Sequence, residues 1–246
     1  MKKQEIMTNK VNHREAIHSR ETQSSILNPF KQPLVRSKQC RTHFFWSCII
    51  FASLSLLLAA CSPSPPTHQE NICTIFNEYP QWYWAAKDVR DRWHIPISVL
   101  MSVMYSESRF TAAAKPPRDR LLFIVPWQRP STAYGYSQAL NQTWRNYQAD
   151  TGHHNAYRDE FSDAADFIGW YSHQIALRTG IPISNSSAYA IYLAYHEGIT
   201  GYINGSYRKK PWLVSLAKQV QRRAWDYQTQ LLSCEKDLPQ KPWWRL

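Results

Sequence analysis

A single carboxylate lies in a stretch where the sequence predicts a buried helix. Residues 96–108 are apolar on most sides of a helical wheel, which favours a central helix. At 100° per residue, Glu107 falls between Leu100 and Val103, inside the apolar face. Burial disfavours the charged form of a carboxyl group and raises its pKa, as a general acid near neutral pH requires. Glu107 is therefore the first candidate for acid/base chemistry, and a helix-end Glu that turns outward to water is the alternative.

Three short motifs occur in order along the chain and include this carboxylate. They are Glu107-Ser108-Arg109-Phe110, Gly135-Tyr136-Ser137-Gln138 and Ala194-Tyr195-His196-Glu197-Gly198. In this order and helical context they resemble the Glu-Ser-x-Phe, Gly-Leu-Met-Gln and Ala-Tyr-Asn-Ala-Gly motifs of the soluble lytic transglycosylase family, over residues 79–232. The resemblance implies a mainly α fold of the lysozyme-like α+β kind. It also implies cleavage of the bond between N-acetylmuramic acid and N-acetylglucosamine in peptidoglycan.

The resemblance assigns roles to residues of the three motifs. Glu107 is expected to be the only catalytic acid/base, and the product is expected to carry a 1,6-anhydro ring. Gln138 is expected to line the sugar cleft, together with Tyr136 of the same motif, and Tyr195 to lie against Glu107. Ser108 either contributes to the site or satisfies a backbone group at the helix end.

Two departures from the family pattern leave alternatives open. The loop 112–136 is long and Pro rich, and its Trp127 is the aromatic residue best placed to stack on sugar. Glu197 stands where the family has Ala, and as a possible contact to substrate it could raise the pKa of Glu107, although the helix end favours a solvent-facing side chain. A hydrolytic muramidase that uses Glu197 or Asp119 as a second carboxylate is one alternative. A glycan-binding lipoprotein without activity is the other.

The elements that must position these residues are helices. Apolar residues at three-to-four spacing predict helices at 81–93, 96–108, 161–175 and 186–196, and another from Pro211. Residues 112–136 are expected to form a long loop with a short strand or hairpin in the cleft. We expect one helical catalytic domain with no cofactor. We expect no metal site either, because Asp150, His153 and His154 lack a further ligand at motif spacing.

The N-terminal part of the chain has the pattern of an export signal. Arg41 precedes an apolar run that ends in Leu58-Ala59-Ala60-Cys61, which resembles the lipobox of bacterial lipoproteins. An uncleaved anchor is the alternative, but the run is shorter than the about 20 residues of a membrane span. We therefore expect a signal peptide at 1–60, a lipidated Cys61 with a flexible tether at 61–70, and the catalytic domain at 71–246. Ser62 after the lipidated Cys favours the outer membrane of a Gram-negative bacterium, with the domain in the periplasm.

Cysteines and charge agree with export. Once the signal and the lipidated Cys are set aside, Cys73 and Cys234 remain, either as a disulfide or as two free buried thiols. Nine Lys and Arg precede Cys61 against three Asp and Glu, so the rest of the chain has 20 basic and 15 acidic residues. These basic residues are scattered, whereas a nucleic-acid groove needs a stripe of positive charge. The expected partners are peptidoglycan strands and, through Cys61, a membrane.

Overall fold

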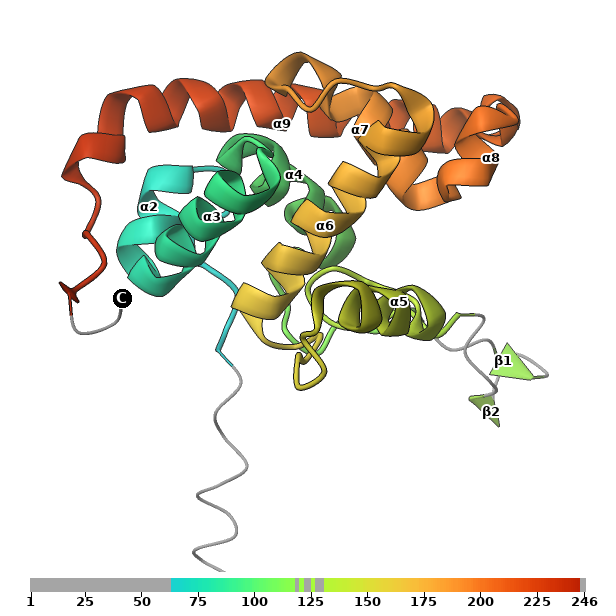
Figure 1. Ribbon diagram of the computed structural model, residues 1–246, viewed down its shortest axis with the longest axis horizontal. Coiled ribbons are helices and arrows are strands. Elements are labelled where there is room, and N and C mark those ends of the chain that lie inside the picture. Colours follow the sequence, from blue (N-terminus) through green and yellow to red (C-terminus); the bar gives the residue numbers. More distant parts are fainter. Residues whose placement is uncertain (1–62, 118–119, 122–124, 127–130, 244–246) are drawn as a thin grey trace, which may run out of the picture. The chain divides into compact units, whose positions relative to one another are not determined.

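The computed structural model describes residues 63–117, 120–121, 125–126 and 131–243, and their fold is mainly helical (Figure 1). The helices are α2 (Ile72–Glu78), α3 (Pro80–Trp93), α4 (Ile97–Ser108), α5 (Asn141–Thr151), α6 (Phe161–Thr179), α7 (Ala188–Glu197), α8 (Ile199–Ile203) and α9 (Pro211–Cys234). Short 3₁₀ turns lie at Asn185–Ser187, Ser206–Lys209 and Glu235–Asp237. Strands β1 (Arg120–Leu121) and β2 (Val125–Pro126) pair antiparallel, with Leu121 opposite Val125. A mainly helical fold with a short hairpin in the long loop is what the sequence predicts.

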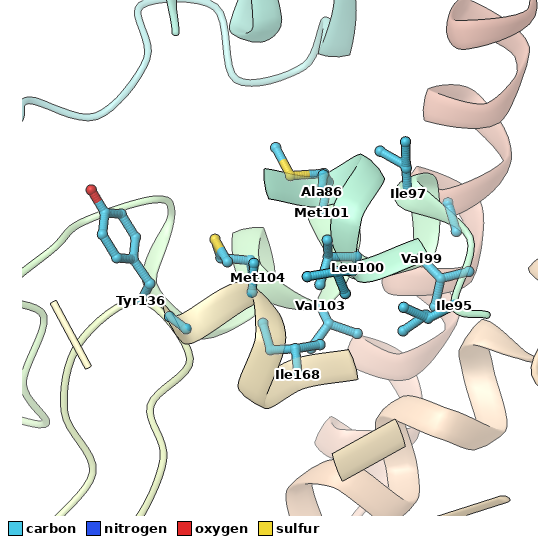
Figure 2. Packing of buried hydrophobic residues seen from close by; sticks show 14 of the residues in the cluster. Ala86, Ile95, Ile97, Val99, Leu100, Met101, Val103, Met104, Tyr136 and Ile168 are labelled. Atoms are coloured by element: carbon cyan, nitrogen blue, oxygen red, sulfur yellow. The ribbon is translucent and has the colours of Figure 1, made fainter. Parts of the chain in front are cut away.

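Helix α4 lies at the centre of the core. Nine of its twelve residues are buried, so the helix has almost no solvated face until its last turn. It packs against α3, α6 and α9. Figure 2 shows Leu100 and Val103 of α4 near Ile168 of α6. The helix begins after Pro96 and ends at Arg109, which adopts the left-handed conformation with φ of 49°. This ending places Glu107 in the last turn, where the buried helix reaches the surface.

Helix α9 packs along the central helix α4. Its buried residues form one stripe: Leu213, Ala217, Val220, Ala224, Tyr227 and Leu231. Spacing of three to four residues is the helical period, so this stripe faces a single direction. Helix α9 packs against α4, α7 and α2, as Figure 1 shows for the long red helix. Among the described residues, no helix is both long and apolar enough to cross a membrane.

An aromatic cluster anchors the loop that leads into α5. The rings of Trp82 and Phe161 stack with centroids 4.2 Å apart, and the fully buried ring of Tyr136 meets both of them edge-on at 5.7 Å. Gly135, with φ of +79°, precedes it, and a Cβ there would lie 2.0 Å from the carbonyl oxygen of Arg158. Only glycine fits this position. The loop is therefore held firmly three residues before Gln138.

A disulfide joins the two ends of the folded region. Cys73 of α2 and Cys234 at the end of α9 are bonded, with their Cα atoms 6.2 Å apart and a sequence separation of 161. In the chain-entropy model, closing so long a loop in the unfolded chain stabilises the fold by up to about 5 kcal/mol. The bond connects α2, which the sequence does not predict as a helix, to the end of α9.

Candidate active site

Glu107 combines a buried carboxyl atom with an opening to the surface. Glu107 as a whole is part-exposed, whereas its Oε1 is buried and has no hydrogen-bond partner among the described residues. Burial raises the pKa of Glu107 to about 7, and a smaller opposing effect comes from a hydrogen bond with the Tyr192 hydroxyl. A carboxyl group with this pKa is populated in both protonation states near neutral pH. It can therefore both give and take a proton in one reaction.

Helix α7 supplies two tyrosines beside this carboxyl group. Tyr192 hydrogen-bonds Glu107, and burial followed by the charge of Glu107 raises the pKa of Tyr192 far above its ordinary value. Tyr195 is also close, since the charge of Glu107 contributes, after burial, to its raised pKa. Its hydroxyl, however, donates to the carbonyl oxygen of Ser137 at 2.8 Å. Tyr192 thus stabilises the charged carboxylate, and Tyr195 ties α7 to the loop that carries Gln138.

Gln138 is held in a fixed orientation by its own side chain. Its backbone is left-handed, with φ of 50°. Its Nε2 donates to the carbonyl oxygens of Gly135 at 2.8 Å and Ala114 at 3.0 Å. Both amide hydrogens are used in this way, and no donor to its Oε1 is found within the described part of the chain. The Oε1 remains as an acceptor for a hydroxyl or acetamido N–H group of a ligand.

A cleft of about 560 Å³ brings these elements together. Its walls are Glu107, the loop residues Ser131, Ala133, Gln138, Ala139 and Leu140, Thr143 of α5, Phe167 and Tyr171 of α6, and residues 195–198. Of the residues singled out in the sequence, Glu107, Gln138, Tyr195 and Glu197 line this cleft. The lining is mixed polar and aromatic, as in many ligand sites, and includes two carboxyl groups, those of Glu107 and Glu197.

Other residues singled out in the sequence lie elsewhere. Tyr136 is fully buried in the aromatic cluster and does not line the cleft, so its side chain contributes packing instead of a substrate contact. Ser108, a candidate substrate contact, does not line the cleft: its Oγ donates to the carbonyl oxygen of Met104 at 3.2 Å, which is the second of the two roles considered for it. Cys61, Asp119 and Trp127 lie outside the described residues.

The environment of Glu197 differs from the one expected from the sequence. A solvent-facing side chain was expected, but its side chain is only 4% exposed and lines the cleft. It accepts hydrogen bonds from Lys210 Nζ at 2.7 Å and Ser206 Oγ at 2.5 Å. Burial alone would raise the pKa of Glu197, but these bonds outweigh it and the net pKa is lowered. Glu197 is therefore an ionised, paired carboxylate, and burial, not its negative charge, raises the pKa of Glu107.

Tyr192 is the residue that sequence reasoning missed. It lies three residues before Tyr195, so both tyrosines share one face of α7. This spacing relative to the Ala-Tyr motif could have identified it. The hydrogen bond that lowers the pKa of Glu107 comes from Tyr192 and not from a residue of the three motifs.

The described residues form a mainly helical fold with a cleft of about 560 Å³, and a buried carboxyl group with a raised pKa lies in its wall. The family model described as Transglycosylase SLT domain matches residues 49–234. This match covers well over half of the chain, and the chain therefore belongs to the transglycosylase SLT domain family. Membership supports a lysozyme-like lytic transglycosylase that acts on peptidoglycan. Comparisons with curated proteins and with solved structures give no match.

Proposed function

We propose that the protein cleaves the β-1,4 bond between N-acetylmuramic acid and N-acetylglucosamine and leaves 1,6-anhydro-muramic acid ends. The observation that carries this proposal is the state of the two carboxyl groups in the cleft. Glu107 has a pKa raised to about 7 by burial, while Glu197 is ionised and paired with Lys210. One group can exchange protons near neutral pH and the other is committed to a structural ion pair.

The reaction uses Glu107 twice. As the protonated acid it gives its proton to the bridging oxygen, and the bond from that oxygen to C1 of muramic acid breaks as positive charge develops at C1. The resulting carboxylate then takes the proton from the 6-hydroxyl of the same sugar, and O6 forms a bond to C1. Glu107 is protonated again, and no water is consumed. The intramolecular nucleophile is already positioned, which removes the need to orient a solvent molecule.

The surrounding groups support both halves of this cycle. The hydrogen bond of Tyr192 stabilises the carboxylate that exists between the two proton transfers. The Oε1 of Gln138 offers an acceptor at the wall of the cleft, on a loop that its own amide group locks. A hydrolytic muramidase would need a second carboxylate free to activate water. The bonds of Glu197 to Lys210 and Ser206 argue against that role.

Glu107→Gln tests the assignment of the catalytic residue. The amide keeps the shape of the side chain but cannot deliver a proton, so release of soluble fragments from purified sacculi should fall by at least about 10² to 10⁴. Glu160→Gln is the matched control, because Glu160 is an exposed carboxylate at the start of α6 that does not line the cleft. Turnover of Glu107→Gln close to that of the control would place the chemistry on another residue.

We further propose that the protein is a lipoprotein of the outer membrane with its domain in the periplasm. The support is the lipobox-like sequence ending at Cys61, followed by a Pro-rich segment before α2, which begins at Ile72. Two or more acyl chains anchor a protein stably where one does not. Cys61→Ser should leave the precursor unprocessed or release the protein from the membrane fraction. Normal processing with membrane retention would contradict the lipid anchor.

A further inference from the structure

A second hollow adjoins the catalytic cleft. Its volume is about 410 Å³, and it shares part of its wall with the cleft: Thr143, Tyr171, Glu197 and Gly198 line both. The remaining wall comes mainly from α5 and α6, which pack against each other. Because the two hollows share residues from three elements, a ligand seated in the cleft can continue into the second hollow without leaving the protein surface.

The second hollow carries charges that the catalytic cycle does not use. Asn146 and Asp150 lie one turn apart on α5, and Gln174 and Arg178 lie one turn apart on α6. The exposed Arg178 donates from Nη2 to the Oε1 of Gln174 at 3.1 Å, a bond to a neutral group. Within the described residues, neither Arg178 nor Asp150 has an ion-pair partner. The hollow therefore presents one cation and one anion that remain available to a ligand.

The charge of this hollow distinguishes between the two parts of peptidoglycan. In an intact strand the lactyl carboxyl group of muramic acid is joined to the peptide stem as an amide, so the sugars carry no net charge, whereas the stem itself carries carboxylates. A guanidinium group binds a carboxylate through two parallel N–H donors, which gives both affinity and orientation. A neutral sugar needs only hydrogen bonds, which an uncharged amide side chain could donate as well as Arg178.

We propose that the second hollow binds the peptide stem of a muramoyl unit seated in the adjoining cleft, with Arg178 pairing with a stem carboxylate. This inference rests on the proposed function, because it takes peptidoglycan as the substrate of the cleft. The contact between Arg178 and the stem carboxylate makes the enzyme selective for glycan that still carries its stems. The selectivity lies in substrate binding, and Glu107 performs the same chemistry on either kind of strand.

The test compares two substrates and two arginine variants. The substrates are soluble glycan strands with stems and the same strands stripped of their stems by an amidase. The amidase leaves a lactyl carboxylate on each muramic acid, so the stripped strands also test whether Arg178 binds that group instead of the stem. Arg178→Ala removes the proposed contact. Arg145→Ala is the matched control, since Arg145 is an exposed arginine of α5 that also donates to a glutamine of its own helix, Gln142 at 2.6 Å, and lines neither hollow.

Arg178→Ala should lower kcat/KM on strands with stems by about 3- to 10-fold, through a raised KM with unchanged kcat. The loss should shrink at high salt, because the contact is exposed and ionic. Activity on stripped strands, and the activity of Arg145→Ala on both substrates, should match the wild type. Circular dichroism and thermal melting of both variants check that they fold.

The outcomes distinguish failure of stem binding at Arg178 from failure of the proposed cleavage reaction. An equal loss on both substrates, or no loss on either, would overturn stem binding at Arg178 while leaving the cleavage reaction in place. A wild-type enzyme that cleaves neither substrate would instead contradict the proposed function itself.

Discussion

Replacing the carboxyl group of Glu107 by an amide should make the folded protein lose less stability as pH rises. The pKa of Glu107 is raised by burial from 4.5 in an unfolded chain to about 7 in the folded protein. Below pH 4.5 the group is protonated in both states and has no effect on the free energy of unfolding. Between pH 4.5 and 7 the folded state holds a proton that the unfolded state has lost, so stability falls as pH rises.

The size of this effect follows from the two pKa values. One pKa unit corresponds to about 1.4 kcal/mol, so the charged carboxylate costs the folded state up to about 3 kcal/mol above pH 7. Glu107→Gln removes this cost because the amide does not titrate. The difference in unfolding free energy between variant and wild type should therefore grow by up to about 3 kcal/mol from pH 4.5 to pH 8 in favour of the variant.

Urea unfolding of both proteins at pH 4.5, 6, 7 and 8 measures this difference. Any fixed gain or loss from replacing the side chain is the same at every pH, and the other titrating groups cancel between the two proteins. Only Glu107 contributes to the change with pH. A difference that stays constant from pH 4.5 to 8 would refute the raised pKa, and with it the argument that burial prepares this residue to act as an acid.

Three further changes test other parts of the structure. Tyr192→Phe removes the hydrogen bond that lowers the pKa of Glu107, so the alkaline limb of the kcat/KM profile should move to higher pH; an unmoved limb would contradict that contact. Trp82→Ala empties a position that is 2% exposed and stacked on an aromatic ring, and should cost about 3 to 5 kcal/mol in urea unfolding; a loss below 1 kcal/mol would argue against the aromatic cluster as an anchor. Replacing both Cys73 and Cys234 by Ser should lower stability by up to about 5 kcal/mol and make it insensitive to reductant, whereas an unchanged stability would show that the disulfide contributes nothing.

The sequence predicts the parts of the fold whose apolar pattern is strong. Helix α4 is recognisable because nearly every residue before its last turn is buried, and the same pattern reveals Glu107 as an acid on an apolar face. Helix α5 is not recognisable, since only Trp144 and Tyr147 of its eleven residues are buried. Helix α8 has five residues, which is too short for a helical period to stand out. Short or mostly exposed helices are fixed by their neighbours, which a pattern along one segment does not contain.

The environment of Glu197 shows the same limit at the site. Its place at the end of α7 suggests a side chain in water. The chain then turns back through α8 and the 3₁₀ turn at Ser206–Lys209, and brings Lys210 within 2.7 Å of the carboxylate. The partner is thirteen residues away in sequence, and no spacing rule for a single helix reaches that far. Likewise, the three motifs led to the cleft but not to Tyr192, whose position matters only once the fold brings its hydroxyl to Glu107.

The most direct test of the central claim is the fate of solvent oxygen during cleavage. Purified sacculi are digested in water enriched in heavy oxygen, and the released muropeptides are analysed by mass spectrometry. If Glu107 acts alone and the 6-hydroxyl is the nucleophile, the new ends are anhydro sugars that lack one water and contain no heavy oxygen. Glu197→Ala should leave this product pattern unchanged. Reducing ends that carry heavy oxygen, and that disappear on Glu197→Ala, would contradict the transglycosylase mechanism and establish hydrolysis with two carboxylates.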